Sequence, residues 1–256
     1  MKVRYFVKII GVFIILFLSN CTVKPVQSKE NFKIKVDTLV YFDELRERKI
    51  PVAIYHPENP KNDNNIPIIF SHGWGENAGG DYFRYSYLTE YLASKGYFVV
   101  SIQHELPTDE MLPMQGDFKI TRRPNWEGGV QNMSYVLNKI KKDFPKYNYD
   151  KLALIGHSNG GDMTVLFAHK YPKLVKRIIS MDNRRMPLPR TAKPKIFTLR
   201  SNDYPADAGV LPNEIEIKRY DIEISYTNIN HGNMDNDATI EERKFITEKI
   251  LEFLKK

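Results

Sequence analysis

The chain has few of the features that mark several common protein classes. Cys21 is its only cysteine, so no intramolecular disulfide can form. The longest apolar run near the N-terminus, residues 9–18, would cover only about half of a ~30 Å hydrocarbon core as a helix, which is too short to span a membrane. The net charge of +7 comes from scattered basic residues without a long run. This pattern indicates a solvated surface and argues against a nucleic-acid partner.

The first twenty residues have the pattern of a targeting segment. A basic start precedes the apolar run 9–18, and Leu18-Ser19-Asn20-Cys21 follows it. These four residues resemble a bacterial lipobox, although Asn20 stands where Gly, Ala or Ser is usual. We expect a lipoprotein signal peptide over 1–20, a lipidated Cys21 and a tether over 21–31. The alternative is a hydrophobic leader with an incidental cysteine. The chain is therefore expected to be exported and membrane-anchored, in the periplasm or at the cell surface.

Residues 32–256 have the pattern of a single α/β domain. Two strand-like segments, 32–41 and 50–55, come first, and Pro51 suggests an edge position for the second. Apolar strands and amphipathic helices then alternate, which predicts a mostly parallel sheet with helices on both faces. The segment between the last two acidic strand ends is too short for a large cap domain. The expected strands are 66–70, 97–102, 152–155, 175–180, 195–199 and 222–226, and the expected helices are 81–95, 127–142, 162–169 and 238–255.

The stretch Gly156-His157-Ser158-Asn159-Gly160-Gly161 lies between a predicted buried strand and a predicted helix. A G-x-S-x-G motif in this context indicates a nucleophile elbow, in which a strained turn projects the serine hydroxyl beyond the sheet. The glycines fit because the turn brings backbone segments too close together for a Cβ. Ser158 is therefore the predicted nucleophile.

A serine nucleophile needs a base, and the base needs an acid to fix its tautomer. His231 follows the last predicted strand and is the expected base, whereas His157 is expected to pack beside the nucleophile. Asp203, after the penultimate strand, is the favoured acid, and Asp182, after the strand before it, is the alternative. The order serine, acid, histidine is the one found in α/β-hydrolases.

The tetrahedral intermediate of acyl transfer also needs hydrogen-bond donors for its oxyanion. The backbone N–H groups of Asn159 and Trp74 are the expected donors. The long loop 103–126 is expected to shape an acyl pocket, and His104 is a further candidate for lining it. Arg122 and Arg123 are interpreted as solvated surface residues, with binding of an anionic substrate group as the alternative. The residues expected to line the acyl pocket are Met111, Met114, Phe118 and Trp126.

Taken together, these residues resemble the α/β-hydrolase superfamily from about residue 32 to 256. The segments 92–100 and 103–105 are most similar to compact esterases of the dienelactone-hydrolase and platelet-activating-factor-acetylhydrolase group. The dienelactone branch uses a cysteine where this chain has Ser158. The acetylhydrolase branch has its acid at a position matching Asp182. The segments that carry the resemblance are His72-Gly73-Trp74, 156–161, Asp203 and His231.

The predicted activity is hydrolysis of a small-molecule carboxylic ester through a Ser158–His231–Asp203 triad and an acyl-enzyme. This chemistry requires no metal and no cofactor. A peptidase or amidase is the enzymatic alternative because the same triad cleaves amides. A non-catalytic binding protein on a hydrolase scaffold is the alternative from another class.

Overall fold

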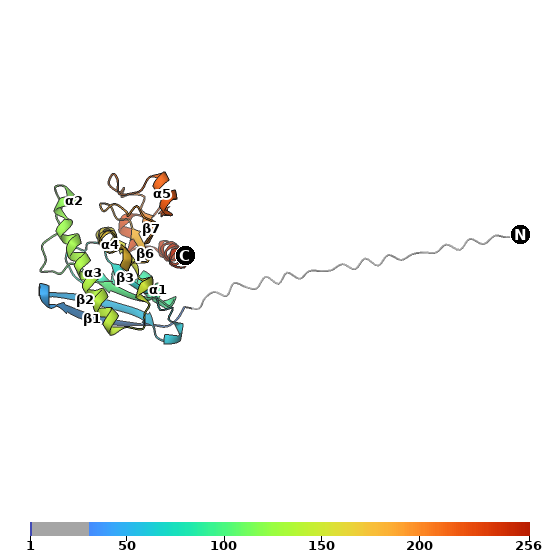
Figure 1. The fold of residues 1–256 in the computed structure, drawn as a ribbon, viewed down its shortest axis with the longest axis horizontal. Coiled ribbons are helices and arrows are strands. Elements are labelled where there is room, and N and C mark those ends of the chain that lie inside the picture. The colour runs from blue at the N-terminus through green and yellow to red at the C-terminus, as the bar shows by residue number, and fades with distance from the viewer. Residues whose placement is uncertain (2–30) are drawn as a thin grey trace.

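The computed structural model describes Met1 and residues 31–256 (Figure 1). Residues 2–20 of the predicted signal peptide, Cys21 and all of the predicted tether except Asn31 lie outside the described residues. Within the described part of the chain, every helix is too short or too polar to cross a bilayer.

Eight strands and six α-helices make up the domain, joined by loops and short 3₁₀ turns. The strands are β1 (Ile34–Asp43), β2 (Arg48–Pro57), β3 (Pro67–Ser71), β4 (Phe98–Ile102), β5 (Ala153–His157), β6 (Arg177–Met181), β7 (Lys195–Arg200) and β8 (Glu223–Tyr226). The α-helices are α1 (Ser86–Ser94), α2 (Phe118–Thr121), α3 (Arg123–Asp143), α4 (Ser158–Lys170), α5 (Glu214–Tyr220) and α6 (Ile240–Leu254).

All eight strands form one sheet, in the order β1-β2-β4-β3-β5-β6-β7-β8. The pairs β1–β2 and β2–β4 are antiparallel, and every other neighbouring pair is parallel. The predicted α/β class with a mostly parallel sheet is confirmed. Because β3, β5, β6, β7 and β8 run in the same direction, the loops that follow them meet along one edge of the sheet.

The predicted edge position of the second strand is wrong, because β2 lies between β1 and β4. Pairing with β4 covers only Val52 to Tyr55, and the Pro51 carbonyl accepts from the N–H of Gln103, one residue beyond β4. The N and C=O of a strand residue point to the same side. The missing N–H of Pro51 therefore faces Gln103, just past the end of β4, so the proline removes at most the last bond of this ladder.

Two hydrophobic clusters, one on each face of the sheet, hold the layers together. In the first, α3 and α4 cover residues such as Ile69 and Leu154; in the second, α1 and α6 cover residues such as Phe70 and Ile155. Neighbouring strand residues thus belong to opposite clusters, as the period of two in a strand requires. Figure 1 shows α3 and α1 on opposite sides of the strands. Burial on both faces explains why the central strands read as continuous apolar runs.

Two short helices, α2 and α5, lie in segments for which the spacing of apolar residues predicts no helix. Helix α2 has four residues and α5 has seven. The start of α5 carries a capping box between Asn213 and Glu216, in which each side chain accepts from the other residue's backbone N–H. The expected helix 81–95 instead begins with a 3₁₀ turn over Asp81–Phe83, and α1 starts at Ser86.

The first turn of α4 lies directly against the end of β3. A Cβ on Gly160 would lie 2.2 Å from the His72 carbonyl oxygen and 2.4 Å from that of Ser71. A Cβ on Gly156, at the end of β5, would lie 2.3 Å from the Gly160 carbonyl oxygen. Since the neighbouring atoms are backbone, they cannot move aside as a side chain could. These two glycines let strand, turn and helix approach to contact distance.

The close approach predicts opposite effects for two helical glycine substitutions. Gly160→Ala is expected to lower the free energy of unfolding by about 3 kcal/mol or more, because overpacking against backbone forces α4 away from the sheet. Gly128→Ala in α3 is the matched control, because nothing lies within 4 Å of its added Cβ. Its stability should rise by about 0.5–1 kcal/mol from helix propensity. Urea unfolding measures both, and equal effects of the two substitutions would contradict this account of α4 packing.

Candidate active site

Ser158 stands at the turn between β5 and α4 with a backbone φ of 52°. A left-handed conformation is unfavourable for a residue with a Cβ and costs on the order of 1–3 kcal/mol. Packing of the glycines on either side holds the turn in this shape. The predicted strained elbow is present, and it directs the Ser158 side chain beyond the carboxyl end of β5.

Three side chains from three different strand ends form one hydrogen-bonded chain. The Ser158 Oγ lies 2.9 Å from Nε2 of His231, and Nδ1 of His231 lies 2.6 Å from Oδ2 of Asp182. An ionised carboxylate can only accept, so the Nδ1–H donates to Asp182 and leaves Nε2 free to accept the serine proton. The arrangement can therefore withdraw a proton from the Ser158 hydroxyl.

The favoured acid, Asp203, does not contact the imidazole in the structure. Its Oδ1 accepts from the backbone N–H of His231 at 2.7 Å, and its side chain is exposed. Asp182, the alternative from the sequence, is the residue whose carboxylate meets the ring. The difference arises because β6 lies beside β5, the strand that leads into the elbow, whereas β7 lies one strand further away. Asp182, the first residue after β6, also has a φ of 55°, so the chain turns back there. Asp203 instead fixes the main chain of the loop that carries the histidine.

Asp182 is fully buried and surrounded by donors. Nη2 of Arg200 lies 3.0 Å from its Oδ1, while the backbone N–H and hydroxyl of Ser201 donate to the two carboxylate oxygens at 3.0 and 2.6 Å. Burial alone would raise the pKa of Asp182. The hydrogen bond from His231 and the positive charge of Arg200 outweigh it, so the pKa lies below its ordinary value. Arg200 and Ser201, which sequence analysis missed, thus keep the Asp182 carboxylate ionised.

His157, inside the elbow, packs beside the reacting groups as expected. Its ring centroid lies 4.6 Å from that of His231, and its Nδ1 shares a hydrogen bond of 2.7 Å with the Tyr85 hydroxyl. Burial, together with the neighbouring His231, lowers the pKa of His157 to about 3, so the ring stays neutral. The Tyr85 hydroxyl also accepts from the N–H of Gly73 at 3.1 Å. Tyr85 therefore ties the loop after β3 to the elbow.

The two expected oxyanion donors come from adjoining segments. Asn159 is the second residue of α4, so its N–H belongs to the first turn, which lacks intrahelical acceptors. Trp74 lies in the loop after β3. At the preceding residue, Gly73, a Cβ would lie only 3.4 Å from the Ser158 Cβ. Both N–H groups thus belong to backbone that lies close to the serine.

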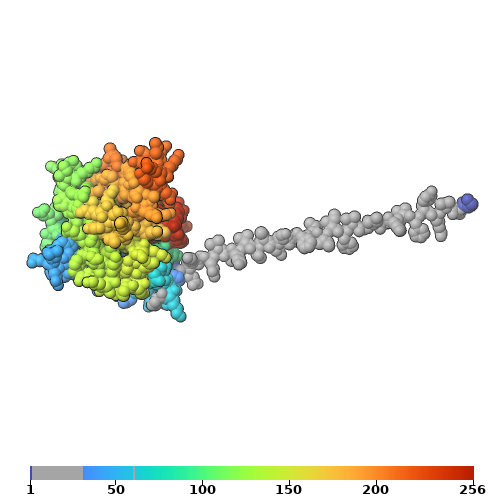
Figure 2. Space-filling model, in the orientation of Figure 1, coloured from blue at the N-terminus to red at the C-terminus, as the bar shows by residue number. Residues whose placement is uncertain are grey.

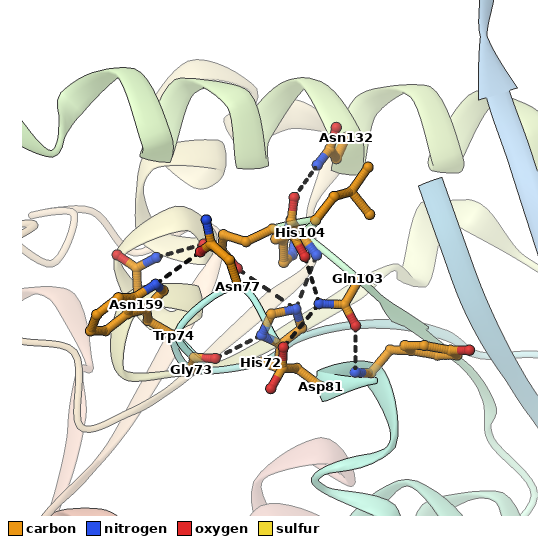
Figure 3. A network of polar contacts seen from close by, with 12 residues as sticks. His72, Gly73, Trp74, Asn77, Asp81, Gln103, His104, Asn132 and Asn159 are labelled. Atoms are coloured by element: carbon orange, nitrogen blue, oxygen red, sulfur yellow. Dashed lines mark hydrogen bonds and ion pairs between the residues drawn. The ribbon is translucent and has the colours of Figure 1, made fainter. Parts of the chain in front are cut away.

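His72 fixes the loop that carries Trp74. Its Nε2 accepts from the backbone N–H of His104 at 3.0 Å, so its Nδ1 carries the proton and donates to the Gly73 carbonyl at 2.7 Å (Figure 3). Figure 3 shows this ring between the loop and the end of β4, with Gln103 and Asp81 hydrogen-bonded nearby. The neutral tautomer is thereby set by two backbone partners.

The side chain of Asn159 has its own set of partners, which the sequence did not predict. Its Oδ1 accepts from the Trp126 indole at 2.8 Å, and its Nδ2 donates to Glu105 at 3.0 Å and to Asn125 at 2.8 Å. Trp126 is buried in the core. The expectation that Trp126 lines an acyl pocket is therefore wrong: it holds the residue next to the nucleophile.

The remaining residues expected around the pocket separate into distinct places. Met111 and Met114 are exposed, whereas Phe118 is half-buried beside Arg122. Buried His104 and exposed Met111 both line a cavity of about 400 Å³ bounded by the loop 103–126 and α3. Among the described residues, no group of three or more His, Cys, Asp or Glu side chains is arranged to hold a metal ion.

A family model described as alpha/beta hydrolase fold matches residues 66–208. The chain belongs to this α/β-hydrolase family. The matched region contains β3 to β7, the elbow, Asp182 and Asp203, and His231 lies beyond it. No match was found among curated proteins.

Solved structures share the α/β-hydrolase fold at low sequence identity. The esterase Est22 superposes with a TM-score of 0.63 at 12% identity, covering 87% of this chain and 80% of that one. The Francisella virulence factor BioJ gives a TM-score of 0.61 at 14% identity, covering 86% and 85%. The Pyrococcus horikoshii acylaminoacyl peptidase gives 0.60 at 14% identity, covering 87% of this chain but 41% of that one. At these identities the likeness shows the fold alone.

The double role of Tyr85 predicts a stability effect. In Tyr85→Phe, the buried Gly73 N–H and His157 Nδ1 both lose their partner, which should lower the free energy of unfolding by about 1–3 kcal/mol. Tyr97→Phe is the control. Its ring is equally buried, but its hydroxyl makes no hydrogen bond within the described part of the chain. Urea unfolding should show a lower free energy of unfolding for Tyr85→Phe than for Tyr97→Phe. Equal stability of the two variants would contradict the role of the Tyr85 hydroxyl in linking the loop after β3 to the elbow.

Proposed function

We propose that this chain is a serine hydrolase that cleaves carboxylic esters. The observation that carries the proposal is the hydrogen-bonded chain from Ser158 through His231 to Asp182 at the carboxyl ends of β5, β8 and β6. The carboxylate, the imidazole and the hydroxyl follow one another in the order that general-base activation of a serine requires. A binding protein would need neither the strained elbow nor the aligned histidine.

In the proposed reaction, the Ser158 Oγ attacks the ester carbonyl while His231 Nε2 takes the hydroxyl proton. The resulting imidazolium is stabilised by the ionised Asp182, and the oxyanion is held by the backbone N–H groups of Asn159 and Trp74. His231 then returns the proton to the leaving alcohol. A water molecule, activated by the same histidine, hydrolyses the acyl-enzyme and restores Ser158.

Within the family, the contact between Asp182 and His231 supports a relationship to the acetylhydrolase-like branch of compact esterases. That branch has its acid at the position matching Asp182, whereas Asp203 was the favoured residue in the sequence. The serine at position 158 separates the chain from the dienelactone branch, which uses cysteine. A small-molecule ester is the proposed substrate class, and amides form the alternative.

A fluorophosphonate probe tests the nucleophile. The purified protein should be labelled stoichiometrically at Ser158, whereas Ser158→Ala should not be labelled. Mass spectrometry of the intact protein measures the added group. Turnover of p-nitrophenyl acetate and of a matched p-nitroanilide then distinguishes esterase from amidase. An unlabelled, folded wild-type protein would favour the non-catalytic alternative.

Two conservative substitutions test which carboxylate is the acid. Asp182→Asn should lower kcat on p-nitrophenyl acetate by about 10³–10⁴-fold, because the amide favours the wrong histidine tautomer. Asp203→Asn should lower it less than about tenfold, because the asparagine Oδ1 still accepts from the His231 N–H, a hydrogen bond worth on the order of 1 kcal/mol. The reverse ranking of the two variants would show that Asp203 is the acid.

We propose further that the enzyme is exported and anchored through a lipidated Cys21. The basic start, short apolar run and lipobox-like Leu18-Ser19-Asn20-Cys21 support this, and all of them precede the described domain. Stable anchoring takes more than one acyl chain, as bacterial lipoproteins carry. The natural surroundings of the site would then lie outside the cytoplasmic membrane.

Metabolic labelling with an alkyne fatty acid tests the anchor. The wild-type chain should incorporate label and remain with membranes after a carbonate wash, because several acyl chains together bind a bilayer stably. Cys21→Ala should lose both properties while retaining fluorophosphonate labelling of Ser158. A Cys21→Ala protein that stays with the membranes would argue against lipidation.

A further inference from the structure

Two arginines from different segments share one aromatic ring near the site. Arg122 is the N-cap residue of α3, and Arg185 lies in the loop after β6. Their guanidinium carbons lie 4.3 and 4.5 Å from the ring centroid of Phe118, the first residue of α2. Two positive charges that repel each other are thus both held against one phenyl ring.

A third arginine connects this pair to the reacting groups. The Arg184 guanidinium carbon lies 3.5 Å from the ring centroid of Tyr204, and the Tyr204 ring lies 4.7 Å from that of His231. Arg184 also donates from Nε to the Pro205 carbonyl at 3.2 Å, which fixes its orientation. One aromatic ring therefore separates a guanidinium from the proposed base.

The loops that carry these arginines belong to the carboxyl edge of the sheet. Arg122 lies in the connection between β4 and α3, Arg184 and Arg185 follow β6, and Tyr204 follows β7. In the space-filling view, the green surface of the α2 region borders the gold and orange surface of the chain after β5 (Figure 2). We refer to Arg122, Arg184 and Arg185 as the arginine cluster.

None of the ion pairs within residues 31–256 involves the arginine cluster. Neighbouring arginines differ in this respect: Arg123 pairs with Glu127 at 2.7 Å and Arg190 with Glu216 at 3.3 Å. The acid nearest in sequence to the elbow, Asp162, uses its Oδ1 to accept from three N–H groups, including the backbone N–H of Arg185. The Asp162 charge acts on Arg122 and Arg185 from beyond ion-pair distance, and no salt bridge joins it to either guanidinium within residues 31–256.

Arg122 hydrogen-bonds only to neutral groups within residues 31–256, the Pro113 carbonyl at 2.9 Å and the Met114 sulfur at 3.4 Å, and the lack of an ion pair is costly for it. This residue is 8% exposed, and the sequence-based interpretation of it as a solvated surface residue is wrong. Burial, followed by the positive charge of Arg185, lowers the pKa of Arg122 to about 10. Buried charges are normally paired, because desolvation without a counter-ion is unfavourable. An anion bound here would offset the repulsion between Arg122 and Arg185 and would give Arg122 an ion-pair partner.

We infer that the ester cleaved at this site carries a carboxylate group, which the arginine cluster binds beside Ser158. The inference rests on the proposed function. Guanidinium groups match the planar geometry of carboxylates and can donate two parallel hydrogen bonds to them. Phe118 and Tyr204 hold the guanidinium planes in place, so little side-chain freedom is lost on binding. The cluster thereby selects charged esters over neutral ones of the same size.

Two pairs of esters that differ only in charge test the inference. The p-nitrophenyl monoester of glutaric acid and p-nitrophenyl pentanoate carry carboxylate and methyl at the same position of the acyl chain. Sodium 4-acetoxybenzoate and its methyl ester place the difference on the alcohol side. In at least one pair, the wild-type kcat/KM should favour the anion about tenfold or more, which corresponds to one charged hydrogen bond of about 1.5 kcal/mol.

The arginine variants should reduce this preference. In Arg122→Gln and Arg185→Gln, the ratio of kcat/KM between the charged and the neutral ester should fall about tenfold, mainly through KM of the charged ester. Arg123→Gln is the matched control, because it removes the adjacent positive charge without touching the cluster. Its ratio should stay within about twofold of wild type, since exposed charges are screened. If Arg122→Gln fails to fold, Arg185→Gln carries the test alone.

The outcomes separate the two proposals. Ser158-dependent hydrolysis without preference for the anion in either pair overturns the inference but leaves the esterase intact. A preference that survives both arginine variants, or that falls equally in Arg123→Gln, overturns it as well. Absence of Ser158-dependent hydrolysis of all four esters would instead refute the proposed function. Glutarate should also inhibit hydrolysis of the neutral ester competitively in wild type, and at least tenfold more weakly in Arg185→Gln.

Discussion

The close approach between the first turn of α4 and the end of β3 is the constraint on which the site depends. Only a residue without a Cβ fits at Gly160, where the helix touches the backbone of Ser71 and His72. The contact brings the first N–H groups of α4 and the loop after β3 to the same point. It also forces the left-handed turn at Ser158. Helix packing and placement of the nucleophile are therefore consequences of one steric condition.

Positive charges are arranged in two layers around the histidine. In the interior, Arg200 is paired with Asp182 and keeps that carboxylate ionised. The arginine cluster forms no such ion pair within the described domain, and the Asp162 charge acts on it only from beyond ion-pair distance. The inner arginine stabilises the resting protein, whereas the outer ones remain available to a ligand. Two groups of the same residue type thus contribute differently because only one has its charge satisfied within the chain.

Local sequence patterns predicted the fold class and the elbow because both depend on neighbouring residues. The buried strand before Gly156 and the helix after it lie within twenty residues of Ser158. The choice between Asp182 and Asp203 was not local: it depends on strand order and on a backbone turn after β6. Trp126 was misassigned for a related reason, because an indole that donates to Asn159 looks in sequence like any apolar pocket residue. The edge position predicted from Pro51 was wrong for a similar reason, because a proline is tolerated in β2 only through the place where β4 ends.

His231 is contacted by two carboxylates that follow adjacent strands, Asp182 at its ring and Asp203 at its main chain. Both strand ends that the sequence offered for the acid therefore place a carboxylate against the histidine. During divergence, a chain of this kind can move the acid from one strand end to the next by small changes in loop shape. It need never pass through a form in which the histidine has no carboxylate beside it. In this chain, Asp203 holds the loop that carries His231, and this structural role is a reason for the second carboxylate to be retained.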